Sequence, residues 1–127
     1  MAQYADIVEI AAPAEAQPGS RVDITVGVKN TYSAAIGIMV GGALEYGVTA
    51  WPGITFPTNW ANVAGGATES FNGYFIMPDK KVTIHAYSYY YAGESWHFDD
   101  EMTKAVQPAE EIPSQFGSIE IVNYAKV

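Results

Sequence analysis

The sequence predicts an all-β domain, built as an antiparallel sandwich of about seven strands. Apolar and polar residues alternate in several short stretches, no stretch keeps a helical period, and turn-forming residues recur between the stretches at the spacing typical of a sandwich. The chain has 127 residues, of which 49% are hydrophobic and 16% charged, and this is enough for one domain with a core of its own. We expect residues 1–106 to form this domain.

The first half of the chain contains the clearest strand. In "RVDITVGVKN", residues 21–30, valine and isoleucine alternate with polar residues, as in a half-buried strand. Two prolines and a Gly-Ser pair separate it from the earlier "YADIVEI", which therefore forms a strand of its own. A third strand begins at "IGIMVGG". Its two glycines lead into "ALEYGVTA", and the two segments form either a tight hairpin or one kinked strand.

The second half begins with weaker periodicity. We expect residues 51–68 to form an ordered loop with one short strand around residues 54–56. The strand "ESFNGYFIM" ends in a Pro-Asp turn, and "KVTIHAYSYYY" is the longest strand candidate. "AGE" then closes a hairpin onto "SWHFDDEMTKAV", whose acidic centre suggests a bulge or bend before a final strand at residues 102–106. The residues expected to share one core are Val22, Ile24, Val26, Val28, Ile36, Ile38, Val82, Ile84 and Ala86.

A C-terminal extension follows the predicted domain. Residues 107–115 have the composition of an extended linker, and residues 116–127, "FGSIEIVNYAKV", return to β-type alternation. Such an arm can fold back onto the edge of its own sheet or pair with a neighbouring subunit. We take the second alternative forward as a hypothesis. The apolar anchors would be Phe116, Ile119 and Ile121, with Tyr124 as a further contact.

Composition excludes several classes of function. Asp and Glu outnumber Lys and Arg by 14 to 6, and without a basic stripe the chain is a poor partner for nucleic acid or an anionic membrane. No apolar run is long enough to span a bilayer, and the N-terminal residues lack the regions of a signal peptide. Cysteine is absent, and no nucleophile elbow, phosphate loop or nucleotide fingerprint is present. We therefore expect neither enzyme activity nor a cofactor.

Two stretches resemble a known family. "APAEAQPGSRVDITVGVKNTYSAA" is similar to the opening of immunoglobulin-like domains of the bacterial and archaeal adhesion-related (CARDB-like) kind, in which a Pro-Gly turn leads to a strand of alternating valines. "FNGYFIMPDKKVTIHAYSYY" looks like the paired E and F strands of such domains. The resemblance covers about the first 106 residues. It implies an immunoglobulin-like sandwich and carries no catalytic residues.

A tyrosine row is the first candidate binding site. On a strand, Tyr87, Tyr89 and Tyr91 would point outward from the core, beside Trp96. Such a row can be a purely structural ladder, because cross-strand aromatic contacts stabilise a sheet. Tyrosine is also enriched at interfaces, so the row suits a protein partner, or stacking on sugar rings.

Other candidate sites carry weaker signals. Trp51 and Trp60 lie in the proline-containing loop, where they could cover the open end of the sandwich or form a platform for a glycan. The acidic cluster at residues 99–101, with Glu94 nearby, offers oxygen ligands for Ca²⁺, but it lacks the spacing of an EF-hand and favours a solvated acidic turn. The two histidines, His85 and His97, are too few for a metal site by themselves. We therefore expect no bound metal.

These observations favour a non-catalytic structural or assembly protein. The leading hypothesis is a surface component of a virus or phage particle, such as a capsid decoration or tail protein, that self-associates into a homo-oligomer or larger assembly. Such a protein would be made in the cytoplasm without a signal peptide. The alternative is a carbohydrate-binding or cell-surface adhesion module, which the three tryptophans and the tyrosine row motivate.

Overall fold

The computed structural model describes residues 2–109 and confirms the all-β sandwich. Eight strands account for its regular structure. Their bounds are β1 Ala5–Ala11, β2 Glu15–Ala16, β3 Arg21–Asn30, β4 Ile36–Glu45, β5 Trp60–Val63, β6 Thr68–Ile76, β7 Val82–Ala92 and β8 Ser95–Pro108. The period-two stretches of the sequence correspond to β1, β3, β4, β6, β7 and β8.

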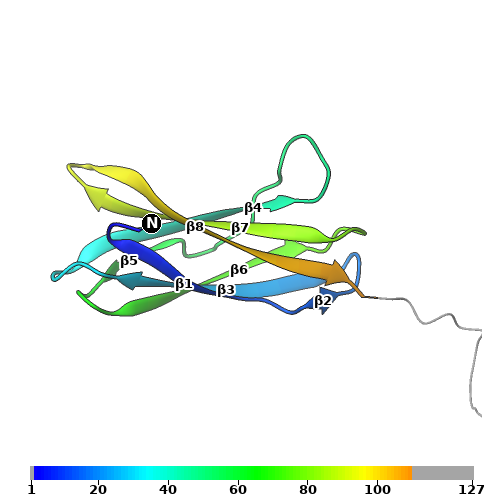
Figure 1. Cartoon of the computed structure of the whole chain (residues 1–127), viewed down its shortest axis with the longest axis horizontal. Helices are drawn as coiled ribbons and strands as arrows, with labels where there is room; N and C mark the ends of the chain where they lie inside the picture. Colours follow the sequence, from blue (N-terminus) through cyan, green and yellow to red (C-terminus); the bar gives the residue numbers. More distant parts are fainter. Residues whose placement is uncertain (1, 110–127) are drawn as a thin grey trace, which may run out of the picture.

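Two sheets face each other in this sandwich (Figure 1). A three-stranded sheet has the order β1-β3-β6, and a five-stranded sheet has the order β2-β8-β7-β4-β5. All neighbours are antiparallel except β2 and β8, which run parallel over two residue pairs. This is an immunoglobulin-like arrangement. β1, β3 and β6 take the places of the A, B and E strands in one sheet, and β4, β7 and β8 take the places of the C, F and G strands in the other.

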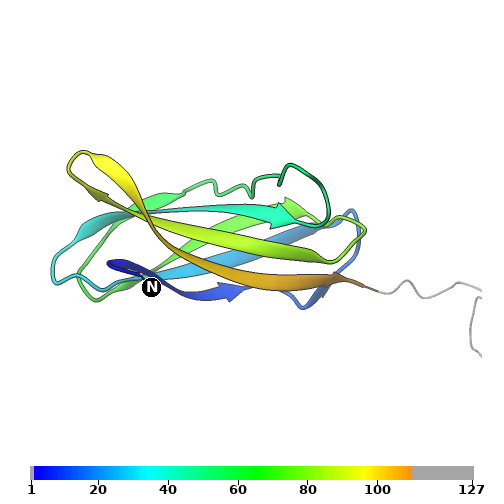
Figure 2. The ribbon, with the colours of Figure 1, turned by 45° about the horizontal axis from the view of Figure 1, so that its top comes forward.

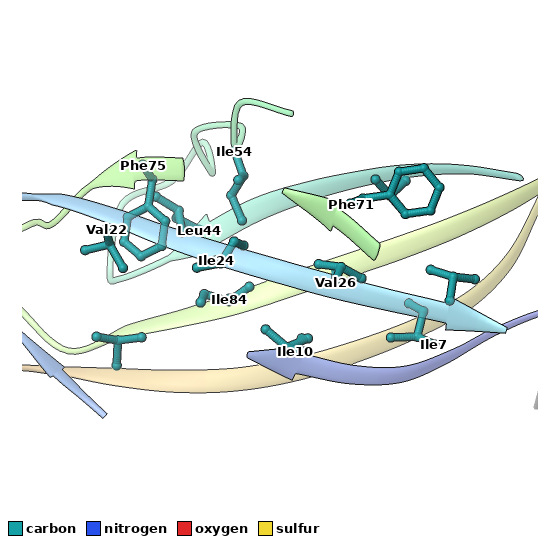
Figure 3. Close-up of a cluster of buried hydrophobic side chains, with 14 of the residues drawn as sticks. Ile7, Ile10, Val22, Ile24, Val26, Leu44, Ile54, Phe71, Phe75 and Ile84 are labelled. Atoms are coloured by element: carbon teal, nitrogen blue, oxygen red, sulfur yellow. The ribbon is translucent and has the colours of Figure 1, made fainter. Parts of the chain in front are cut away.

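The core lies between the sheets (Figure 3). Side chains from β1, β3, β6 and β7 point toward one another there, and Val26, Val28 and Ile84 have no exposed surface. Burying a valine or isoleucine contributes roughly 1.5–3 kcal/mol, so these positions hold the two sheets together. All expected core residues are buried except Ile36, which is only partly buried. The reason is its place at the start of β4, beside the edge strand β5.

The segment with two open alternatives is one strand. β4 runs without interruption from Ile36 to Glu45, so its paired glycines do not make a hairpin. Gly42 instead permits a close approach. A Cβ atom there would lie 2.9 Å from Cδ1 of Ile54, which packs down from the following connection. The absent side chain thus makes room for a core residue.

The connection between β4 and β5 differs from its predicted form. No strand forms around residues 54–56; Thr55 makes one isolated bridge to Tyr74 of β6, and Gly53 makes one to Ala43. The regular element lies later, at β5, which pairs with β4 over four residue pairs. A strand this short has too few residues for a recognisable alternation. It forms because its backbone can pair with the free edge of β4.

The hairpin β7–β8 contains the predicted bulge. Ser88 is opposite Asp100 and Tyr89 is opposite Phe98, which leaves Asp99 as the extra residue. β8 continues through the bulge as one strand to Pro108, where Gln107 and Pro108 pair with β2. The tip of this hairpin projects at one end of the sandwich, and β8 ends at the other (Figures 1 and 2).

The acidic residues of the bulge are not a solvated turn. The Asp99 carboxylate accepts hydrogen bonds from the backbone N–H groups of Gln3, Tyr4 and Ala5, at 2.7, 2.8 and 2.6 Å. Asp100 accepts one from the N–H of Ile7 at 3.0 Å. A bulge turns two consecutive side chains the same way, so both carboxylates reach β1 of the facing sheet. We call this set of contacts the carboxylate clamp.

The predicted C-terminal arm lies outside the described residues. This includes its anchors Phe116, Ile119 and Ile121, as well as Tyr124.

Candidate functional site

The outer face of the five-stranded sheet gathers the predicted aromatic residues. Along β7, Val82, Ile84 and Ala86 are buried, while the alternate residues face away from the core, as the pattern predicted. The register places outward residues of β4, β5 and β8 beside them. We call this set of side chains the aromatic face. It consists of Trp51, Trp60, Tyr87, Tyr89, Tyr91, Trp96 and Phe98.

Aromatic contacts run along this face. Tyr87 and Tyr89 each meet Phe98 edge-on, with ring centroids 6.2 and 5.9 Å apart. Tyr91 meets Trp96 in the same way at 5.2 Å. Tyr87 and Tyr89 are half-buried by these neighbours. The periphery of the aromatic face is open to solvent: Phe98 is 58%, Trp60 55% and Tyr91 46% exposed. The row is therefore both a cross-strand ladder and a solvent-facing apolar surface.

A groove opens between two tryptophans of the face. It has a volume of about 380 Å³, with Trp60 and Trp96 among its lining residues and Gly37 and Met39 from β4 between them. A Cβ atom at Gly37 would lie 3.2 Å from Cβ of Tyr91 and 3.4 Å from the Trp96 ring. The glycine therefore allows the Trp96 indole to lie low across the sheet. Asn62 adds one amide to the otherwise apolar lining.

His85 occupies a polar centre within the aromatic face. Its Nδ1 lies 2.7 Å from Oε2 of Glu101, and its Nε2 lies 2.8 Å from Oε1 of Glu45. Trp51 covers the ring, stacked at a centroid distance of 4.5 Å. Both carboxylates accept hydrogen bonds best if both ring nitrogens carry a proton, so the geometry fits the imidazolium. A cation stacked on an indole is also favourable.

The surroundings of His85 raise its pKa above the ordinary value of 6.5. Burial alone would lower the pKa, but the hydrogen bonds and charges of Glu101 and Glu45 outweigh that effect. A raised pKa in the folded state stabilises the fold below the unfolded pKa. That stabilisation disappears as the pH rises through the folded pKa.

This centre predicts a pH-dependent stability. As the pH rises from about 6.5 through the folded pKa of His85, the free energy of unfolding should fall, and His85→Gln should remove that part of the fall. Urea titrations across this range measure it. His97→Gln is the matched control, since these are the two histidines of the chain. An unchanged pH profile in His85→Gln would contradict the prediction.

The structure brings together candidates that the sequence left apart. Trp51 and Trp60, considered as a glycan platform or as a cover for the end of the sandwich, lie on the same face as the tyrosine row. Sequence reasoning did not select Phe98, Met39 or the Glu45–His85–Glu101 centre. Phe98 could have been found, because it is two residues from Trp96 and strand alternation places both on one side. The other members depend on cross-strand register.

No group of three or more His, Cys, Asp or Glu residues that could hold a metal ion occurs within residues 2–109. The same part of the chain includes no helix with the length and apolar character that a membrane span needs.

Comparisons with known proteins show the fold and no family. No family model and no curated protein sequence matches the chain. Among solved structures, it is similar to the Pseudomonas fluorescens alkylpurine DNA glycosylase AlkC bound to DNA containing an abasic site analog. The TM-score is 0.62 at 12% identity, and the match covers 87% of this chain and 32% of that one. It is also similar to the sporulation control protein Spo0M of Bacillus subtilis, with a TM-score of 0.55 at 16% identity over 86% of this chain and 51% of that one.

A third similar structure is a chain from the complex of zinc 2-glycoprotein and prolactin inducible protein from human seminal plasma. Its TM-score is 0.51 at 12% identity, covering 81% of this chain and 96% of that one. The present chain thus spans about a third and about half of the first two proteins. At these identities the likeness concerns the β-sandwich alone.

Proposed function

We propose that this protein is a non-catalytic assembly module whose aromatic face is its contact surface. One observation carries the proposal: five large aromatic side chains on one face of the sandwich are between 36% and 58% exposed. They are Trp51, Trp60, Tyr91, Trp96 and Phe98. A contiguous apolar surface of this kind is uncommon on a monomer and is typical of an interaction site.

The composition of the face supports a protein partner. Tyrosine and tryptophan bring large contact areas with few rotatable bonds, so ordering them on binding loses little entropy. The carboxylates near the middle of the face, Glu45 and Glu101, are bound to His85. A second copy could therefore cover the aromatic rings without bringing unpaired carboxylates together there, although the chain has a net charge of −8. We propose self-association through this face.

Three finer assignments stay predictions of the sequence. They are the virus or phage particle as the site of assembly, production in the cytoplasm without a signal peptide, and the kinship with adhesion-related immunoglobulin-like domains.

Association should depend on Phe98. Replacing this exposed ring with serine should weaken self-association about tenfold or more, since a large aromatic side chain that an interface buries often contributes over 1 kcal/mol to binding. Sedimentation velocity over a concentration series measures the effect. Ile76→Ser is a matched control, because Ile76 is 59% exposed and belongs to the other sheet. Equal association of both variants and the unaltered chain would count against the proposal.

Carbohydrate binding is the second candidate function. The groove between Trp60 and Trp96 favours it, because a sugar ring could stack on indole while the Asn62 amide bonds a hydroxyl. A glycan array followed by tryptophan fluorescence titration separates the two functions. Saturable quenching by one glycan, lost in Trp60→Ala, would favour the sugar. Association that responds to Phe98→Ser without any glycan response favours assembly.

A further inference from the structure

The three-stranded sheet has an edge that is only half covered. β6 is its outer strand, and near the C-terminal end of β6 the N–H and C=O of Tyr74 both bond to Thr55, at 2.9 and 3.1 Å. Backbone groups of a strand point to alternate sides, so those of Ser70 and Asn72 point off the same edge as those of Tyr74. Within residues 2–109, the N–H and C=O groups of Ser70 and Asn72 have no hydrogen-bond partner on that side.

The covered half of the β6 edge pairs with an extended segment, and this indicates the kind of partner that the open half could bind. The Thr55 bridge is antiparallel, with both hydrogen bonds of a strand pair. Phe56 then packs against Gly73, where a Cβ atom would lie 2.6 Å from the phenylalanine ring. The connection leaves the edge after this point, and Thr68–Asn72 is open to a further strand.

A hollow lies beside the open half of the edge. Its volume is about 310 Å³. Pro57, Trp60, Ala61 and Phe71 provide apolar lining, and Thr58, Glu69, Ser70 and Asn72 provide polar lining. An added strand would thus find both unpaired backbone groups and a place for an apolar side chain. Unpaired strand edges are templates for pairing with another chain.

We propose that this open edge receives residues 116–124 of a second copy of the chain as a fourth strand. The segment "FGSIEIVNY" has strand alternation and a single charged residue, Glu120. Ile119 and Ile121 lie on one side of such a strand and fit the apolar lining of the hollow.

Chain length favours a second copy over the same chain. β8 ends beside β2, at the end of the sandwich where β6 finishes (Figure 2). Met77 marks this end of the sandwich, because its backbone bonds to Gly19 and Ser20, shortly after β2. Ser70 is seven residues before Met77, so it lies about 23 Å from this end along β6. The width between the sheets adds about 10 Å. The seven residue steps from Ala109 to Phe116 span at most about 25 Å, so Phe116 of the same chain could come opposite Ser70 only if the connection were straight and fully extended.

Disulfide trapping tests the proposal, because the natural chain has no cysteine. Single variants Asn72→Cys and Glu120→Cys, each in the full chain, are mixed and oxidised. The expected result is a mixed disulfide dimer, formed about tenfold or more above the Asp23→Cys and Glu120→Cys mixture, since bound thiols have a high effective concentration. Asp23 lies on the same outer sheet face, opposite Tyr74, but on β3. Adding Ser70→Pro to the Asn72→Cys chain should abolish the cross-link, because proline removes the N–H yet is tolerated at a strand edge.

The outcomes separate this inference from the proposed function. Phe98→Ser should leave the cross-link unchanged, since the aromatic face belongs to the other sheet, while Ser70→Pro should leave association through Phe98 unchanged. Yield equal to that of the Asp23→Cys control overturns the inference. So does a disulfide that forms only within one chain carrying both cysteines, or a dimer of Asn72→Cys alone, which would indicate pairing between two β6 edges. Circular dichroism of each variant excludes loss of the fold as the cause.

Discussion

Replacing Ile84 with alanine should lower the free energy of unfolding by roughly 2–5 kcal/mol. The side chain is fully buried, near the start of β7, where it meets the core residues of the facing sheet (Figure 3). Alanine loses the transfer free energy of the removed carbons and leaves a cavity that the packed sheets fill only in part. Urea unfolding followed by circular dichroism measures the change.

Ile76→Ala is the control for this substitution. It makes the same chemical change on β6, but Ile76 is 59% exposed, so its effect should stay within about 0.5 kcal/mol. Ile24→Ala, on β3 and only 2% exposed, should behave like Ile84→Ala. A loss below about 0.5 kcal/mol at both buried positions would mean that the facing of the strands is different.

Removing the carboxylate clamp should have the second largest effect. Asp99→Asn should lower the free energy of unfolding by about 2–4 kcal/mol. This is more than one hydrogen bond to a charged group contributes and less than the sum for three independent ones. One Asp99 oxygen accepts from Gln3 and the other from Tyr4 and Ala5. An asparagine keeps the size but presents an NH₂ group to at least one of these N–H donors, whichever way its amide is turned.

Hydrogen exchange locates the damage caused by Asp99→Asn. The amides of Tyr4, Ala5 and Ile7 should exchange much faster, before the centre of β7 does, because the clamp holds only β1. Asp23→Asn is the control. Its ion pair with Arg21 is largely exposed, so it should change stability by no more than about 1 kcal/mol. Unchanged β1 protection in Asp99→Asn would show that β3 alone holds β1 in place.

The sequence predicted those elements whose signal is local. β3 and β7 bury every second residue, so alternation alone identified the strands and their inner faces. β5 was missed because four residues carry too little pattern. It forms only where β4 supplies an edge. The glycine pair of β4 left a hairpin and a single strand open for a related reason, since Gly42 makes room for Ile54 of the following connection and does not form a local turn.

In the candidate site, too, the features with a local sequence signal were predictable and those that depend on distant strands were not. Tyr87, Tyr89 and Tyr91 face outward because of the period of one strand, and that was predictable. That they share a face with Trp51 and Trp60 depends on the path of a loop and on a short edge strand. The Glu45–His85–Glu101 centre requires the register of three strands at once. Side-chain alternation does not predict this register, because it indicates which face of the sheet a residue lies on and not which residue of the neighbouring strand lies beside it.

The extra residue in β8 also constrains how this chain can vary in length. Trp96 and Phe98 face outward before the bulge, whereas Val106 faces inward after it, so one strand has opposite parity in its two parts. Deleting Asp99 would make the β7–β8 pairing regular and would leave both rings facing outward, but it would remove the carboxylate that accepts three hydrogen bonds from residues 3–5. Natural variants should therefore gain and lose residues in the connection 46–59, where loops tolerate it, while the interval from Phe98 to Glu101 stays constant. At this point of the strand, the extra residue and its carboxylate are what natural variants must keep.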